Sequence, residues 1–241
     1  MITKPTPSQI QAAGRRSAAL VAIVAMATAA QAGMYVAAVP TPGANDYQIT
    51  ASAAAPIYAG QPGTTHPNDY LVMNANVGWK VESMLNFDVS SLAGKTVQSA
   101  ALYLYMTPWE GTGDVVVDLH SLNGVWSEAT VTWNNYEQGN FINTTMDSIT
   151  LSRSGGVDGT GWVKLDVTPL LVQGWVNENP RTTSYGLGLV PVWQGSSQAY
   201  AAYPLSDATY HPVLVVTAVP EPGALCLLGV GGVLALSRRR R

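Results

Sequence analysis

The sequence predicts an all-β protein, an antiparallel β-sandwich of jelly-roll type with one short helix. Short runs of Val, Leu and Tyr recur along the chain, and Gly, Pro, Asn and Ser separate them. Within residues 100–105 leucine and tyrosine alternate, so one set faces a core and the other set faces outward. Many short strands with turn residues between them are typical of sandwiches and jelly rolls. The predicted strands comprise residues 70–73, 83–87, 100–106, 115–119, 162–167, 185–190 and 212–217.

One helix is predicted after the fifth of these strands. Thr168 suits an N-cap and Pro169 suits the first helical position. Leu171 and Trp175 lie four residues apart and therefore share one helix face. With no internal repeat and no dividing linker, we expect a single domain over residues 45–218, preceded by a linker over 33–44.

The N-terminal segment, residues 1–32, predicts a secretory signal peptide. A basic, acid-free start is followed by a run of small apolar residues over 18–30. Ala30 and Ala32 fit a small-x-small cleavage site, so we expect cleavage after Ala32. Sec export is expected, although the pair Arg15 and Arg16 also leaves the twin-arginine route open.

The C-terminal segment, residues 219–241, combines a Pro-Glu-Pro break, a short apolar run and an arginine cluster. The apolar run over 223–236 would cover about 21 Å as a helix, against a hydrocarbon core about 30 Å thick. Its glycines weaken a helix further. Two interpretations remain, a removable sorting signal and a weak membrane anchor whose arginines stay on the cytoplasmic side.

This ordered tail resembles the PEP-CTERM sorting signal of Gram-negative-type bacteria. The resemblance implies export, transient insertion of the tail into the inner membrane, and recognition and removal of the tail by an exosortase. The protein would then reside on the cell surface or in the extracellular matrix. The residues that carry the resemblance are Pro220, Glu221, Pro222, Arg238, Arg239, Arg240 and Arg241.

Removal of both terminal segments changes the charge of the protein. Residues 33–219 retain five basic and fourteen acidic side chains, hence a net charge of −9, whereas the whole chain carries −3. Nucleic acids and anionic membrane surfaces need a basic patch, so both are excluded as expected partners. The single cysteine, Cys226, lies in the tail, so no disulfide is expected in the exported part.

The central region resembles the DNRLRE, or disaggregatase-related, domain, which overlaps carbohydrate-binding module family 96. The segment Val125 to Asn134, VWSEATVTWN, is similar to the family's W-x-E-x-T-x-T-W-N pattern. The resemblance implies a jelly roll and carbohydrate binding. The chain departs from the family at Ser83 and Asn86, where arginine is usual. The other matching blocks are residues 83–92, 97–105, 165–168, 185–187 and 212–216.

Aromatic side chains supply the candidate ligand site, because apolar faces of sugar rings stack on them while amides and carboxylates bind hydroxyls. The chain has seven tryptophans and eleven tyrosines. Trp109 and Trp193 follow predicted strands beside an acid or amide and are the first candidates to bind extracellular polysaccharide. Tyr136 and Trp79 are the next two. We expect packing roles for Trp126, Trp133, Trp162 and Trp175.

Metal binding and catalysis receive less support from the sequence. No cofactor is required, although Asp46 and Asp69 could bind a structural calcium ion; the alternative is that both are solvated loop acids. No catalytic motif is found, and only Glu128 with Asp166 suggest a carboxylate pair for glycoside hydrolysis. We therefore expect a non-catalytic polysaccharide-binding surface or matrix protein. The alternatives are a purely structural biofilm protein and a polysaccharide-degrading enzyme.

Overall fold

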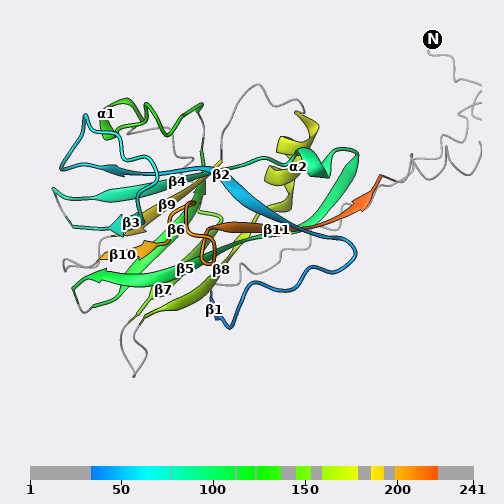
Figure 1. Cartoon of the computed structure of the whole chain (residues 1–241), viewed down its shortest axis with the longest axis horizontal. Helices are drawn as coiled ribbons and strands as arrows, with labels where there is room; N and C mark the ends of the chain where they lie inside the picture. Colours follow the sequence, from blue (N-terminus) through cyan, green and yellow to red (C-terminus); the bar gives the residue numbers. More distant parts are fainter. Residues whose placement is uncertain are drawn as a thin grey trace, which may run out of the picture.

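The fold is an antiparallel β-sandwich, as predicted (Figure 1). The computed structural model describes residues 34–76, 78–111, 113–122, 124–136, 145–152, 159–178, 186–192 and 199–221. Every strand pairing in these ranges is antiparallel. The strands are β1 (Met34–Val36), β2 (Asp46–Tyr58), β3 (Leu71–Asn74), β4 (Val81–Phe87), β5 (Lys95–Glu110), β6 (Val115–Ser121), β7 (Asp147–Leu151), β8 (Gly161–Val167), β9 (Leu187–Val192), β10 (Ala199–Ala202) and β11 (Val213–Pro220).

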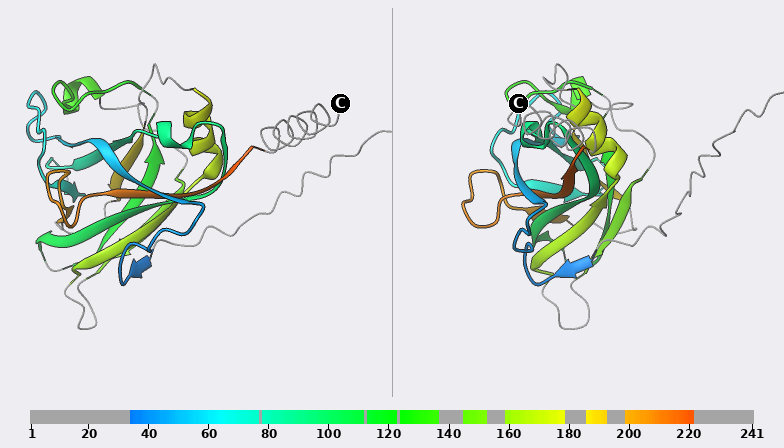
Figure 2. Two further views of the ribbon diagram at one scale, coloured as in Figure 1. Left: turned by 45° about the vertical axis from the view of Figure 1, so that its right-hand side comes forward. Right: turned by 90° about the vertical axis from the view of Figure 1, so that its right-hand side faces the viewer.

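Strand β2 joins the two sheets of the sandwich. Its first part pairs with β11, which continues into β5, β8 and β1. Its second part pairs with β4, which continues into β9, β6 and β7. The register shifts between Ala51 and Ala53, and a bulge of this kind bends a strand. One further side is closed by β10 and β3, which link β5 to β4 (Figure 2).

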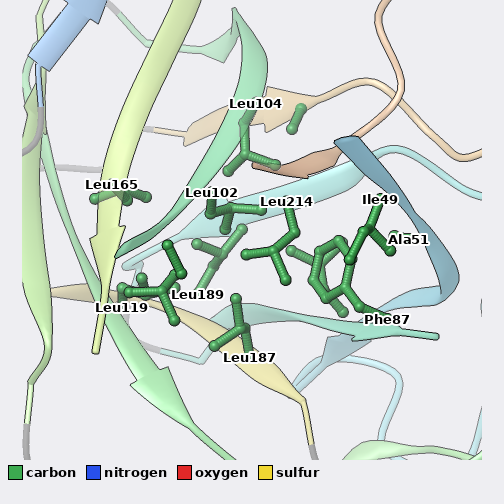
Figure 3. Close-up of a cluster of buried hydrophobic side chains, with 14 of the residues drawn as sticks. Ile49, Ala51, Phe87, Leu102, Leu104, Leu119, Leu165, Leu187, Leu189 and Leu214 are labelled. Carbon is green, nitrogen blue, oxygen red and sulfur yellow. The ribbon is translucent and has the colours of Figure 1, made fainter. Parts of the chain in front are cut away.

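The main core lies between the two sheets. Leu102, Leu104, Leu165 and Leu214 enter it from the sheet of β5, β8 and β11, and Leu189 enters from the opposite sheet (Figure 3). All five are at most 1% exposed. Alternation along β5 therefore places leucine inside and Tyr103 and Tyr105 outside, as predicted from the sequence.

Helix α2 (Pro169–Asn177) closes one end of this core, with Thr168 at the N-cap position. The side chain of Thr168 makes no capping hydrogen bond. Trp175 is 2% exposed and Leu171 packs against the core, which confirms their predicted shared face. Gln173 holds the helix to the start of β5, because its Oε1 accepts a hydrogen bond from the Val97 amide at 2.7 Å.

The segment that carries the W-x-E-x-T-x-T-W-N pattern covers the outside of β2 and β4. Trp126 and Val131 are buried there, and the short helix α1 (Trp133–Tyr136) follows them. Glu128 reaches the β2 bulge, where its Oε1 accepts a hydrogen bond from the amide of Ala54. The pattern thus fixes a covering segment onto the sheet.

The two terminal segments, residues 1–33 and 222–241, lie outside the described residues. The signal peptide with its cleavage site at Ala30 and Ala32 therefore stays a prediction. In the described ranges, no helix has the length and apolar character needed to span a membrane.

Candidate functional site

A groove of about 440 Å³ opens where β3, β4 and the C-terminal end of β5 meet. Two exposed tryptophans, Trp79 and Trp109, line it together. Trp79 is 56% exposed and Trp109 is 48% exposed. We call this hollow the Trp79–Trp109 groove; its other lining residues are Tyr58, Gln61, Val72, Asn74, Asn76, Val81 and Glu110.

Trp79 lies in the turn between β3 and β4 and rests on a glycine. The turn is closed by a hydrogen bond from the Trp79 amide to the Asn76 carbonyl at 3.1 Å. The indole ring packs so closely on Gly60 that a Cβ there would lie 2.4 Å from its Cε3 atom. A side chain at Gly60 would therefore displace the ring.

Trp109 comes from the end of β5, where the strand leaves its pairing with β10. Its ring contacts Tyr70, with ring centroids 5.4 Å apart and planes inclined by 45°. Tyr70 precedes β3, so the contact joins the two strand ends on either side of β10. Trp79 and Trp109 are distant in the chain. They lie on one surface because β3 and β10 pair with each other and link β4 to β5.

Polar groups between the rings are mostly amides. Asn74 Oδ1 accepts a hydrogen bond from the Asn76 amide at 2.8 Å, which orders this wall of the groove. Tyr58 stacks obliquely on His66, with ring centroids 4.3 Å apart. Burial, and then the nearby carboxylate of Asp69, raise the pKa of Tyr58 to about 12. Its hydroxyl therefore remains a protonated hydrogen-bond donor at neutral pH.

This arrangement suits a sugar ligand. Indole rings offer flat apolar surfaces to the faces of sugar rings, and amides offer both donors and acceptors to hydroxyl groups. A concave, partly apolar site with a few convergent polar groups is the usual form of a small-ligand site. Trp79 and Trp109 were both predicted from the sequence as stacking residues, and the fold brings them together in this groove.

The other two predicted stacking residues do not join them. Tyr136 is only 3% exposed, packs with Trp126 and Val131, and donates a hydrogen bond to the Gly124 carbonyl at 3.3 Å. Burial raises its pKa above the usual range. Its prediction as a ligand-stacking ring is corrected, because α1 turns the ring toward the sheet. Trp193 lies outside the described residues.

The predicted calcium ligands lie in different places. Asp46 accepts hydrogen bonds from Thr217 Oγ1 at 2.7 Å and from the Gly43 amide at 3.0 Å, which together lower its pKa. Asp69 accepts a hydrogen bond from the Tyr70 amide at 2.8 Å. Among the residues that the structure describes, no three His, Cys, Asp or Glu side chains gather closely enough to hold a metal ion.

The two carboxylates that the sequence suggested for hydrolysis, Glu128 and Asp166, each bind a different structural partner. Glu128 binds the β2 backbone beneath the covering segment. Asp166 lies on β8, where its Oδ1 is 2.6 Å from Lys164 Nζ. Both carboxylates are thus held by structural contacts on different elements.

Sequence reasoning missed two features on the outer side of β5. One is a second hollow of about 200 Å³ on the outer face of β5, beside Tyr103 and Asp166. The other is a set of five rings linked to one another through ring contacts, here called the aromatic cluster. The alternation within residues 100–105 predicted that Tyr105 faces outward. No periodic pattern indicated that the loop residues Tyr70, Tyr203 and Tyr210 would join it. The aromatic cluster consists of Tyr70, Tyr105, Trp162, Tyr203 and Tyr210.

Two family models match the chain. The model described as carbohydrate-binding module family 96 matches residues 49–218. The model described as the PEP-CTERM protein-sorting motif matches residues 218–241. Among curated proteins, none matches the chain.

Proposed function

Because the chain belongs to carbohydrate-binding module family 96 and carries a PEP-CTERM protein-sorting motif, we propose that it is an exported surface protein that binds polysaccharide in the Trp79–Trp109 groove. The observation that carries the proposal is the pair of exposed indole rings facing one hollow. Exposed tryptophan is costly to hydrate, and residues of this type dominate the energetics of binding surfaces.

The proposed role is binding without catalysis. Among the described residues that line the groove, one is a carboxylate, Glu110. Hydrolysis of a glycosidic bond generally needs two carboxyl groups on opposite sides of the bond. Amides and indole rings supply affinity and orientation, and they carry out neither proton transfer nor nucleophilic attack.

The sorting motif supports the proposed route. Export through the inner membrane would be followed by exosortase recognition of the tail, and the folded domain would be released to, or attached at, the surface of a Gram-negative-type bacterium. Motif and domain adjoin directly, since β11 ends at Pro220 and the Glu221 amide donates a hydrogen bond to the Gly94 carbonyl at 3.3 Å. The folded domain would therefore be presented without an intervening linker.

Affinity electrophoresis of the exported protein in gels that contain single polysaccharides tests the proposal. We expect at least one polysaccharide to retard the protein, and the double variant Trp79→Ala, Trp109→Ala to lose that retardation. A hot-spot tryptophan contributes about 2 kcal/mol or more, so each single variant should bind at least about thirtyfold more weakly.

Leu170→Ala is the matched control, because Leu170 is 81% exposed on α2 and takes no part in the groove. It should bind as the parent protein does. No retardation by any polysaccharide, or retardation that the double variant retains, would refute the proposed site. The protein would then be better described as a structural component of the surface or matrix.

A further inference from the structure

The groove is one end of a longer surface that follows strand β5. Alternate residues of β5 face outward, and the cross-strand pairs confirm which neighbours share this face. Tyr103 pairs with Lys164, and Tyr105 pairs with Trp162. From Ser99, beside the second hollow, to Trp109 in the groove, the strand spans roughly 30 Å at the usual rise per residue.

The aromatic cluster lies between the two hollows, because Tyr105 stands on β5 between Tyr103 of the second hollow and Trp109 of the groove. Starting from Trp109, the contacts run to Tyr70, then to Tyr203 at 5.3 Å and to Tyr210 at 5.1 Å. Tyr210 stacks on Tyr105 at 4.0 Å with planes inclined by 30°.

The last contact joins Tyr105 to Trp162 at 5.5 Å. All five rings of the aromatic cluster keep part of their surface exposed. Rings from β5, β8 and two loops therefore form one continuous aromatic path along the outer face.

The described charged side chains that line the two hollows are three carboxylates and one lysine, Lys164. Glu110 lines the groove, and Asp46 and Asp166 line the second hollow. The described cations near the surface are already paired with carboxylates. Lys164 Nζ is 2.6 Å from Asp166, and Lys80, next to Trp79, lies 2.5 Å from Glu82.

A polyanionic glycan would meet repulsion here. A like charge near a carboxylate is destabilising, and the two lysines described beside the hollows, Lys80 and Lys164, are each already paired with a carboxylate. Hydroxyl groups of an uncharged glycan, in contrast, can donate to Glu110 and Asp166 and exchange hydrogen bonds with the amides of Asn74 and Asn76. The surface therefore fits an uncharged ligand.

We infer that the Trp79–Trp109 groove, the aromatic cluster and the second hollow form one extended site that binds an internal stretch of a linear, uncharged polysaccharide lengthwise along β5. The inference rests on the proposed function and adds the class and length of the ligand. A surface that follows a strand over this length can hold a segment of a long chain, and each ring along it adds contact area to the same ligand.

Two measurements on the exported protein test the inference. The first compares gels containing neutral polysaccharides, such as hydroxyethylcellulose, galactomannan and xyloglucan, with gels containing alginate, polygalacturonate or hyaluronan. We expect retardation by neutral polysaccharides and none by the acidic ones. Retardation should change little as salt is raised, because a neutral ligand forms no ion pairs that salt could screen.

The second measurement uses oligosaccharides of increasing length prepared from the polysaccharide that binds. Affinity should rise with length until both hollows are covered. Tyr203→Ala and Tyr210→Ala should weaken binding of the longest oligosaccharide about tenfold, which corresponds to about 1.4 kcal/mol. Binding of the shortest oligosaccharide, which occupies the groove alone, should not change.

Tyr210→Leu keeps apolar volume without a flat ring, and it serves if Tyr210→Ala unfolds. Leu170→Ala is again the control. Salt-sensitive retention by an acidic polysaccharide would overturn the inference. So would an affinity that stops rising at the length covering the groove alone, together with insensitivity to Tyr203→Ala and Tyr210→Ala. In either case, loss of binding in Trp79→Ala with Trp109→Ala would leave the proposed function standing, whereas no binding to any polysaccharide would refute both.

Discussion

Gly60 sets the position of one ligand-site tryptophan through the absence of a side chain. A Cβ at Gly60 would lie 2.4 Å from the indole of Trp79, closer than real Cβ atoms approach. We expect Gly60→Ala to displace the ring and weaken polysaccharide retardation, with little change in thermal stability because Trp79 is largely exposed.

Gly63→Ala is the matched control in the same loop, since a Cβ at Gly63 would meet nothing within 4 Å. Binding titrations of both variants, with melting curves measured in parallel, check this expectation. Equal binding by Gly60→Ala and Gly63→Ala would show that the position of Trp79 does not matter to the ligand.

Tyr58 is expected to make the free energy of unfolding decrease at alkaline pH. Its pKa rises from 10.0 to about 12 in the fold, so the neutral phenol is favoured there. For a raised pKa, the stabilisation is fully present below pH 10 and is lost as pH rises through about 12. Urea unfolding between pH 8 and pH 12 should therefore show a smaller loss of stability with pH for Tyr58→Phe than for the parent. Curves that fall in parallel would contradict this assignment.

The sequence indicated that Trp79 and Trp109 are exposed, but it did not indicate that Tyr136 is buried. Trp79 and Trp109 lie beside glycine or proline at strand ends, which is where loops display side chains. Tyr136 has polar residues on both sides, which also favour exposure, yet a single helical turn directs its ring onto β2 and β4. Such a turn depends on tertiary contacts, so no periodic pattern marks it.

Helix α2 contributes stability through one buried face. Trp175 is 2% exposed within the main core, so Trp175→Ala should reduce the free energy of unfolding by about 3–5 kcal/mol. Leu170→Ala, on the exposed face of the same helix, should change it by about 0.5 kcal/mol or less. Denaturant titration of both variants distinguishes them, and equal losses would mean that α2 packs differently.

Most strands with branched or large apolar residues were predicted from the sequence, although the short strands β1 and β7 were missed; strands built from small residues were not predicted. The predicted strands at 115–119 and 162–167 correspond to β6 and β8 within two residues. Strand β2 was missed because its C-terminal part reads ASAAAPIY, with four alanines and a proline that have low strand propensity. It forms because its long antiparallel partners β11 and β4 supply hydrogen bonds along its length. The short strand β10, AYAA, was missed for the same reason.

At the scale of the whole molecule, we expect the two terminal segments to direct the protein to the outside of the cell. If exosortase removes the tail, a tag placed after Arg241 should be missing from the exported protein. Intact mass measurement should also show loss of residues 1–32. Full-length, tagged protein retained in the membrane would contradict tail removal and support a permanent anchor.

The end of β11 also determines how the molecule would carry a mechanical load. The chain leaves the sheet at Pro220, which pairs with Lys95 at the start of β5, whereas β3 and β10 beside the groove lie at the other end of the sandwich (Figure 1). A glycan pulled away from a tethered tail would thus draw β5 and β11 past each other along their length. Their eight register pairs would share that force in shear at the same time, rather than opening one after another.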